Sequence, residues 1–239
     1  MSRLPRIHVA GRLTPGPLVL EGDAAHRLRT VLRLRAGEGF LAFAGDGREY
    51  RATVRAVTKS SVTVLLGEVA RQAPMPAVVV ESWCALVRAN RFDWAIEKCV
   101  EAGADIIRPL VTEHGARGDS ASTGRQQRWD RIAVEAAEQS GRLFVPVVEA
   151  PLPFEQALHR HHGTLVVADA AGAPFAEVAP LLPTRGHVAV AVGPEGGLSE
   201  AEREVARHAG ALFLRLGPYV FRTETAAVVA TALLRSSLP

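Results

Sequence analysis

The sequence predicts two domains: a small β-barrel over residues 1–73, then an α/β domain over residues 74–239 whose mostly parallel sheet carries helices on both faces. Three observations support this prediction. The first third of the chain contains short strand-like runs and one short helix. A stretch with two prolines, residues 71–76, then has the composition of a linker. Beyond it, strands and helices alternate, which is typical of a parallel sheet.

Short apolar runs and turn residues define the elements of the first domain. Strands are expected at residues 39–45, 49–57 and 61–66. The turn Gly45-Asp46-Gly47 separates the first two of them. Apolar spacing between Asp23 and Leu34 predicts the single helix, with Asp23 as its N-cap.

The second domain is predicted from alternating periodicities. Strands are expected at residues 77–87, 105–111, 164–168, 187–192 and 211–216. Helices are expected at residues 91–103, 125–140, 199–209 and 223–235. Gly103 and Gly141 are placed to end the first two helices. Ser199 and Glu202 have the spacing of a capping box, which predicts where the third helix begins.

Composition indicates a soluble globular protein. Of the 239 residues, 48% are hydrophobic and 22% are charged, and no uninterrupted apolar run is long enough to cross a membrane. The N-terminus lacks the apolar core of a secretory signal. Cys84 and Cys99 form no CxxC pair, and we interpret them as core residues. These features predict a cytoplasmic protein.

Positive charge is concentrated in the first third of the chain. Residues 1–76 contain 12 Lys and Arg against 6 Asp and Glu, a net charge of +6; the remaining 16 against 19 give −3. A basic module joined to a slightly acidic one predicts that a polyanion is contacted mainly by the first domain. Arginine supplies nearly all of this charge, which a GC-rich genome would also explain. That explanation accounts for the choice of arginine but not for the asymmetry.

A glycine-rich loop follows the strand predicted at residues 187–192. In open α/β sheets ligands bind beyond the carboxyl ends of the strands, and the three glycines of residues 193–197 let a backbone approach a ligand closely. The loop is not a phosphate loop, because Pro194 removes an amide donor and Glu195 brings a negative charge. A cationic or neutral ligand fits better. A tight turn before a capped helix explains the same residues equally well.

A second loop precedes the last helix. Gly217-Pro218 ends a strand, and the apolar residues 219–221 are suited to wall a flat ring such as adenine. Thr223 is interpreted as the helix cap, and Glu224 is favoured by the helix dipole. Arg222 opposes that dipole, which indicates a partner for it, either Glu224 or an anionic substrate.

These two loops together resemble the paired signature of the ribosomal small subunit methyltransferase E family, which are 16S ribosomal RNA (uracil-N3)-methyltransferases. The signature residues are 193–199 (GPEGGLS), 216–218 (LGP) and 222–226 (RTETA). Further matches occur in order at residues 26–34, 43–47, 91–103 and 138–146, so the resemblance covers nearly the whole chain. The departures from the family pattern are Arg88-Ala89, Glu97, Ala102, Tyr219 and Phe221.

The resemblance implies a fold and a cofactor. The first domain would be PUA-like, and the second would be a SPOUT domain with a deep trefoil knot, forming a homodimer with each active site near the subunit interface. The cofactor would be S-adenosyl-L-methionine, whose sulfonium and ammonium groups suit an acidic glycine loop. Its binding residues are expected to be Ala168, Gly193, Pro194, Glu195, Gly196, Leu216, Gly217, Tyr219, Val220, Phe221 and Thr223.

The implied reaction needs a group that removes the proton from uracil N3 or stabilises the anion that its loss produces. Uracil N3 is a poor nucleophile until its proton leaves. Arg222 is the candidate for stabilising charge on the uracil oxygens, and Glu224 for orienting Arg222 or, less directly, for removing the proton. The 16S rRNA of the small ribosomal subunit is the expected partner, with contacts at Arg6, Arg27, Arg33 and Arg91.

Two other functions remain open from the sequence. A ribose 2′-O-methyltransferase on the same fold would need a base for a hydroxyl, and the Asn-rich C-terminal motif of that family is absent. A non-enzymatic RNA-binding assembly factor would need only the basic first domain. No metal site is expected: His159, His161 and His162 have no neighbouring Cys or acidic ligand and are interpreted as an exposed helix end.

Overall fold

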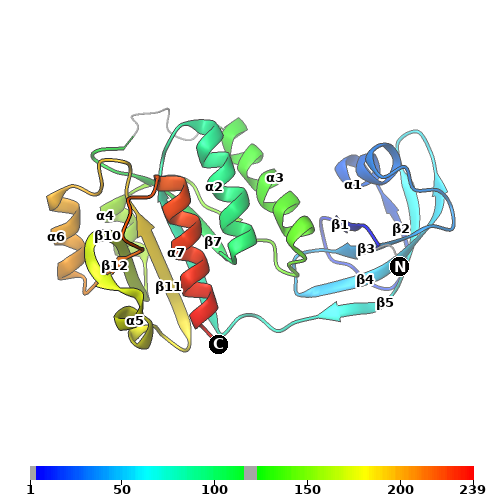
Figure 1. Cartoon of the computed structure of the whole chain (residues 1–239). Coiled ribbons are helices and arrows are strands. Elements are labelled where there is room, and N and C mark those ends of the chain that lie inside the picture. The colour runs from blue at the N-terminus through cyan, green and yellow to red at the C-terminus, as the bar shows by residue number, and fades with distance from the viewer. Residues whose placement is uncertain (1–3, 116–122) are drawn as a thin grey trace. The chain divides into compact units, whose positions relative to one another are not determined.

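The computed structural model describes residues 4–115 and 123–239 of the chain (Figure 1). It divides into two compact units. The first comprises Met1–Met75 and Ala137–Val145, and the second comprises Pro76–Ala136 and Pro146–Pro239. The first unit therefore extends beyond the boundary predicted after residue 73, and it includes a segment that the sequence assigns to the second domain.

The first unit is built around one five-stranded sheet. Its strands are β1 (Arg6–His8), β2 (Gly16–Leu20), β3 (Gly39–Phe43), β4 (Arg48–Val57) and β5 (Val62–Gln72), in the order β1-β3-β4-β5-β2. All pairings are antiparallel except β1 with β3. The expected single helix is a short α-helix, α1 (Gly22–His26), that continues as a π-helical turn over Arg27–Val31. Its N-cap is Glu21, so the predicted cap Asp23 is wrong.

Tertiary contacts explain why Ala137–Val145 joins the first unit. The buried Arg6 guanidinium donates hydrogen bonds to the carbonyls of Ala137, Glu138 and Arg142, at 2.7 to 2.9 Å. Charge-assisted bonds of this kind are roughly twice as strong as neutral ones. Asp46 also forms an isolated β-bridge with Phe144. Partners more than 90 residues apart in the chain leave no local pattern that would predict them.

The second unit is built on a mostly parallel sheet. Its strands are β6 (Val78–Ala85), β7 (Ile106–Val111), β8 (Val147–Val148), β9 (Leu152–Pro153), β10 (Thr164–Pro174), β11 (Gly186–Val192) and β12 (Leu212–Arg215). The order is β12-β10-β11-β6-β7-β8, with β9 also paired to β7, and every pairing is parallel. The helices are α2 (Ala89–Ala102), α3 (Thr123–Ser140), α4 (Phe154–Arg160), α5 (Phe175–Val178), α6 (Glu200–His208) and α7 (Thr223–Ser237).

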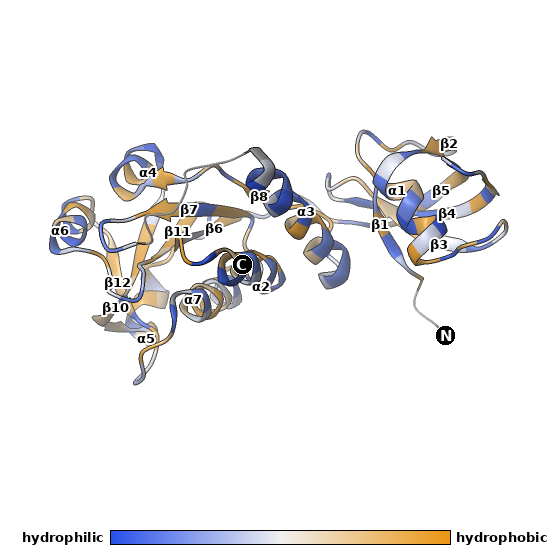
Figure 2. Cartoon of the chain, turned by 90° about the horizontal axis from the view of Figure 1, so that it is seen from above, coloured by the Kyte–Doolittle hydropathy of each residue, from blue (hydrophilic) through white to orange (hydrophobic). Residues whose placement is uncertain are grey.

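Helices cover both faces of this sheet, as predicted. Figure 2 shows the strands lying between α4 and α6 on one side and α2 and α7 on the other. Alternate residues of β6 serve the two faces: Trp83 packs with Phe154 of α4, whereas Ser82 donates to Cys99 of α2 at 3.4 Å. Both cysteines are free and buried, as predicted. The trefoil knot remains a prediction. Among the described residues, no helix is both long and apolar enough to cross a bilayer.

The ends of two helices are informative. Ser199 caps α6 through a complete capping box with Glu202, as its spacing predicts. The N-cap of α7 is Arg222, which makes no side-chain capping bond, so Thr223 is the first helical residue and its predicted capping role is wrong. The Thr223 side chain therefore does not cap α7, although it lies at the start of that helix.

Candidate active site

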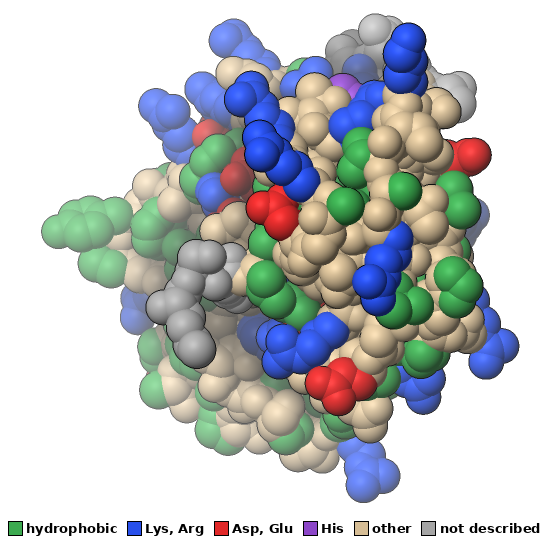
Figure 3. Space-filling model, turned by 90° about the vertical axis from the view of Figure 1, so that its right-hand side faces the viewer, with side chains coloured by type: hydrophobic (Ala, Val, Ile, Leu, Met, Phe, Trp, Pro, Cys, Tyr) green, Lys and Arg blue, Asp and Glu red, His purple; other side chains and the backbone are tan. Residues whose placement is uncertain are grey.

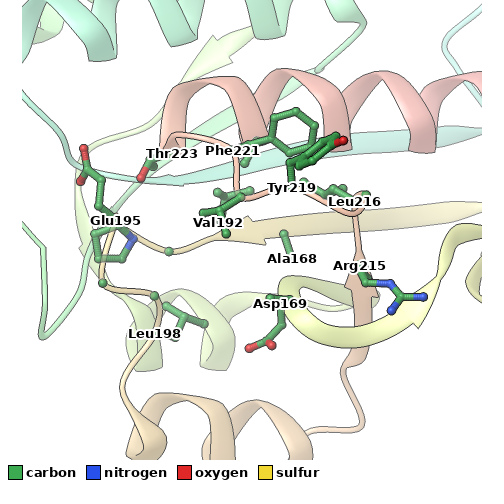
Figure 4. Close-up of a pocket in the computed structure, with 18 of the residues that line it drawn as sticks. Ala168, Asp169, Val192, Glu195, Leu198, Arg215, Leu216, Tyr219, Phe221 and Thr223 are labelled. Carbon is green, nitrogen blue, oxygen red and sulfur yellow. The ribbon is translucent and has the colours of Figure 1, made fainter.

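A pocket of about 480 Å³ lies at the carboxyl ends of β10, β11 and β12. Figure 4 shows its walls: the middle of β10 at Ala168 and Asp169, the loop after β11 at Glu195, and the loop from Leu216 to Thr223. Strands that point the same way bring their carboxyl ends to one edge, where open α/β sheets bind ligands. The two loops that the sequence singles out therefore meet around one cavity, together with the Ala168–Asp169 stretch of β10.

Every residue predicted to bind the cofactor lines this pocket. They are Ala168, Gly193, Pro194, Glu195, Gly196, Leu216, Gly217, Tyr219, Val220, Phe221 and Thr223. Other lining residues were not predicted individually. They are Asp169, Ala170, Val192, Gly197, Leu198, Arg203, Arg215, Pro218 and Ala226. The position of Asp169, directly after the predicted strand at residues 164–168, was the available signal for it.

The glycine loop is both a tight turn and a pocket wall. Gly197 N–H donates to the carbonyl of Pro194 at 2.8 Å, and Gly197 has a φ of +74°. A Cβ on Gly193 would lie 2.8 Å from the backbone nitrogen of Leu198, so a side chain has no room there. A Cβ on Gly196 would meet nothing closer than His114, at 3.4 Å. Gly193 is therefore needed by the turn, whereas Gly196 leaves space.

Apolar side chains form the middle of the pocket. Val192 and Leu198 are buried beneath it, and Phe221 is 37% exposed. Tyr219 and Val220 are 82% and 91% exposed, which is unusual for large apolar residues. Such walls suit a flat, weakly polar ring.

A polar pair lies at the β10 side of the pocket. Within β10 the pairing register with β12 shifts between Ala168 and Ala173, and Asp169 sits in this irregular stretch. Arg203 of α6 contacts the Asp169 carboxylate at 3.5 Å, and Ala171 N–H donates to it at 2.8 Å. Bulges of this kind often re-aim side chains at functional sites.

Buried polar atoms without partners among the described residues occur at Thr223, which lines the pocket, and at Glu224, which follows it in the chain. Thr223 is 2% exposed and Glu224 is 7% exposed. Among the described residues, neither Thr223 Oγ1 nor Glu224 Oε2 has a hydrogen-bond partner. Buried polar atoms in native proteins are rarely left in this state. A ligand in the pocket, which Thr223 lines, would supply partners.

The partner of Glu224 is not the predicted one. Glu224 Oε1 lies 3.7 Å from Arg91 Nε, and Arg91 Nη1 also donates to Glu195 Oε1 at 2.9 Å. Arg222 is exposed, and no ion pair joins it to any described residue. The expectation that Glu224 orients Arg222 is therefore wrong for this structure, because Arg91 holds the carboxylate instead.

Two family models match the chain. Residues 74–235 match an RNA methyltransferase domain, and residues 20–67 match an RNA methyltransferase PUA domain. A relative from Synechocystis, Ribosomal RNA small subunit methyltransferase E, is 33% identical over 220 residues, which covers 89% of this chain and 71% of the relative. The chain belongs to the ribosomal RNA small subunit methyltransferase E family. The family resemblance seen in the sequence is confirmed.

Further relatives support the same membership. The Ribosomal RNA small subunit methyltransferase E of Mycobacterium bovis is 33% identical over 230 residues, covering 89% of this chain and 83% of the relative. A Legionella pneumophila protein solved with the bound cofactor SAM superposes with a TM-score of 0.90 at 30% identity, covering 99% of both chains. The Neisseria gonorrhoeae family member bound to S-adenosyl methionine gives 0.85 at 26% identity, covering 98% of both. The first unit is thus the PUA-like domain and the second is the methyltransferase domain.

The arginines predicted to contact RNA differ in their surroundings. In the PUA-like domain, Arg6 is 9% exposed and pairs with Glu49 at 2.5 Å, so its guanidinium is committed to the fold. Burial raises the pKa of Glu49, but hydrogen bonds from Arg71 and Arg6 lower it by more. Arg27 is half-buried against Glu138. Arg33 is exposed in a left-handed conformation, with a φ of 55°.

The surface of the PUA-like domain is rich in positive charge. Figure 3 shows Lys and Arg side chains spread over it, with few acidic ones among them. The exposed or half-exposed arginines near the helix of this domain are Arg27, Arg29, Arg33 and Arg35. Val31, 63% exposed, lies among them in the sequence. These four arginines, and not the buried Arg6, are therefore the cations of this region that a polyanion could reach.

The histidines near residue 160 do not form a fully exposed helix end. The His161 side chain is only 3% exposed and lies 3.5 Å from Glu81 Oε1, with its ring against Trp83. His187 also contacts Glu81, at 2.9 Å. The interpretation as an exposed helix end is wrong for His161, because its side chain is buried against Glu81. Glu81 lies 80 residues away in the chain, so no local pattern indicates this contact. Among the described residues, no group of three or more His, Cys, Asp or Glu side chains has the arrangement of a metal site.

Proposed function

We propose that this chain transfers a methyl group from S-adenosyl-L-methionine to N3 of a uridine in the 16S rRNA of the small ribosomal subunit. One observation carries the proposal most directly. In a member of this family, three segments enclose a pocket at the carboxyl ends of parallel strands, and the buried Thr223 hydroxyl lining it has no partner among the residues that the structure describes. The site has the polarity and the open hydrogen-bonding capacity of a ligand site.

The pocket fits the proposed cofactor in its chemistry. Its apolar walls at Leu216 and Phe221 suit adenine, and the carboxylates of Glu195 and Asp169 suit cationic groups. Gly196 leaves space that a Cβ would reduce. When bound, S-adenosyl-L-methionine supplies an electrophilic methyl group whose sulfur leaves as a neutral thioether.

Residues of this chain would remove the uracil imide proton and stabilise the charge that develops on the ring. Its imide proton must leave N3, and negative charge then develops on the ring oxygens. Arg222 is exposed at the start of α7 and has no ion-pair partner among the described residues, so it is available to stabilise that charge. Glu224 Oε2 is buried and has no hydrogen-bond partner in the described part of the chain, so it is the group in this cluster able to accept the proton.

The RNA would be held by the PUA-like domain. Arg27 and Arg33 remain candidates for phosphate contacts, because their side chains reach solvent. Arg6 is not a candidate for such a contact, because it is buried in an ion pair with Glu49. We further propose that the enzyme acts in the cytoplasm as a homodimer whose C-terminal region is knotted.

Single-turnover kinetics at saturating cofactor test the role of Arg222, with small ribosomal subunits lacking the modification as substrate. Arg222→Ala should lower the methylation rate by about 100-fold, as loss of an oxyanion donor does, while calorimetry shows little change in cofactor affinity. Arg222→Lys should recover part of the rate, because an ammonium lacks the planar fork. A near wild-type rate for Arg222→Ala would eliminate the catalytic role.

Two other functions make different predictions. A ribose 2′-O-methyltransferase would leave its label on ribose, which nucleoside mass spectrometry separates from a methyl group on uracil. A non-enzymatic assembly factor would bind RNA without binding S-adenosyl-L-methionine. Calorimetric titration with the cofactor therefore distinguishes the enzyme from the assembly factor before any RNA is added.

A further inference from the structure

Arg91 contacts two segments near the pocket that are far apart in the chain. It lies in the first turn of α2, and it contacts Glu195 of the glycine loop at 2.9 Å and Glu224 of α7 at 3.7 Å. One guanidinium thus links the glycine loop to the first turn of α7. A bidentate, planar donor is suited to this role, and a lysine is not.

The two carboxylates differ in how much they depend on Arg91. The Glu195 side chain is 57% exposed, so its ion pair is screened by water and contributes little. The Glu224 side chain is 9% exposed, and Arg91 is its only ion-pair partner among the described residues. Removing Arg91 would leave a buried carboxylate uncompensated, which is strongly unfavourable. The first turn of α7 would then shift to relieve it.

We propose that Arg91 is a positioning residue for methyl transfer rather than an RNA contact. It holds Glu224 so that Oε2, together with Thr223 Oγ1, stays buried and free for the imide of the target base. Through Glu195 it sets the glycine loop against the same helix. Its 33% exposed side chain forms ion pairs with both carboxylates at once, so little of its charge is left for a phosphate. This inference rests on the proposed function.

Arg91→Met tests the proposal with two readouts that separate the alternatives. The single-turnover rate at saturating cofactor and small subunits should fall about 100-fold, because a misplacement of about 1 Å has an effect of that size. Affinity for the same subunits, and its dependence on salt, should stay unchanged. Arg91→Lys should lie between Arg91→Met and wild type, since an ammonium can serve one carboxylate well but not two.

Arg33→Asn is the matched control, because it removes an exposed arginine and asparagine tolerates the left-handed backbone there. It should weaken RNA binding and reduce the salt slope by about 1. If Arg91→Met behaves in this way instead, Arg91 is a phosphate contact and the proposal is overturned. An unchanged rate in folded Arg91→Met would overturn it as well.

A double-mutant cycle keeps the proposal testable if Arg91→Met is unstable. Arg91→Met in the Glu224→Gln background should cost little further stability or rate, because the buried charge is already gone. Additive losses would contradict the coupling. If the wild-type chain transfers no methyl group to small subunits, the proposed function fails, while the unfolding arm of the cycle still decides whether Arg91 and Glu224 act together.

Discussion

Glu81 and Glu224 are both buried in the methyltransferase domain, but their surroundings differ. Glu81, in β6, accepts hydrogen bonds from Trp83 at 2.9 Å and Arg108 at 3.4 Å, and His187 lies 2.9 Å from it. Glu224, which follows the pocket-lining Thr223, has an ion pair with Arg91 at 3.7 Å and an oxygen without a partner among the described residues. The first carboxylate is fully engaged by the protein, and the second is not.

The difference separates stabilising groups from functional ones. Burial raises the pKa of Glu81, but hydrogen bonds from His161, Trp83 and His187 lower it by more, to about 2. Its ionised form is therefore favoured in the folded state and contributes to stability. A buried oxygen without a partner works against stability. The open oxygen of Glu224 is what the proposed function requires, because its partner would arrive with the substrate.

The largest expected effect is on stability at Glu81. Glu81→Gln should lower the free energy of unfolding by about 3 kcal/mol, because it breaks a buried charged network from one side. Glu224→Gln, the matched change at the pocket, should lower it by less than about 1 kcal/mol. Chemical denaturation of the two variants measures both values. Equal losses would show that the two glutamates do not differ as described.

The same contrast predicts a pH dependence of stability. Because the pKa of Glu81 falls from 4.5 to about 2 on folding, its contribution is present above pH 4.5 and is lost as the pH falls toward 2. The stability difference between wild type and Glu81→Gln should therefore shrink over that window. A difference that stays constant from pH 5 to pH 2 would mean that the Glu81 charge is not the cause.

The methylation rate should be more sensitive to Glu224→Gln than to Glu81→Gln, the reverse of the order expected for stability. Glu224→Gln should lower the single-turnover methylation rate by about 100-fold, because an amide cannot accept the imide proton. Folded Glu81→Gln should keep a rate within about 3-fold of wild type, since neither Glu81 nor any residue that contacts its carboxylate lines the pocket, whereas Glu224 directly follows the lining residue Thr223. If Glu224→Gln retains the wild-type rate, another group accepts the proton.

The smallest expected effect is on affinity for the cofactor and comes from a change in the glycine loop. Gly196→Val should weaken S-adenosyl-L-methionine binding by about 10-fold or more while the protein stays folded, because a Cβ there meets only His114 at 3.4 Å. Gly193→Ala should instead disturb the loop, since its Cβ would lie 2.8 Å from a backbone nitrogen. Calorimetry and thermal unfolding of both variants separate these outcomes. Unchanged affinity in folded Gly196→Val would refute the assigned role of the loop.

Local patterns in the sequence predicted most of the methyltransferase domain. The capping box at Ser199 fixed the start of α6, and Gly103, in a left-handed conformation, ends α2 as predicted. The pocket residues were predictable because each loop follows a strand and carries family motifs. In each case the signal lies within a few neighbouring positions.

Contacts between distant residues could not be predicted in this way. Arg91 reaches Glu195 and Glu224, and no spacing within α2 indicates either partner. For the same reason Arg6 looked like an accessible cation, although its ion pair with Glu49 buries it. A charge pattern gives the number of cations in a domain but not which of them are already paired.

Mass spectrometry of 16S rRNA nucleosides tests the central claim most directly. Cells lacking the gene should lose N3-methyluridine from 16S rRNA, and the wild-type gene should restore it. Restoration should fail with Glu224→Gln and succeed with Glu81→Gln wherever that variant accumulates to normal levels. N3-methyluridine that persists in the deletion strain, or loss of a ribose-methylated nucleoside instead, would contradict the account.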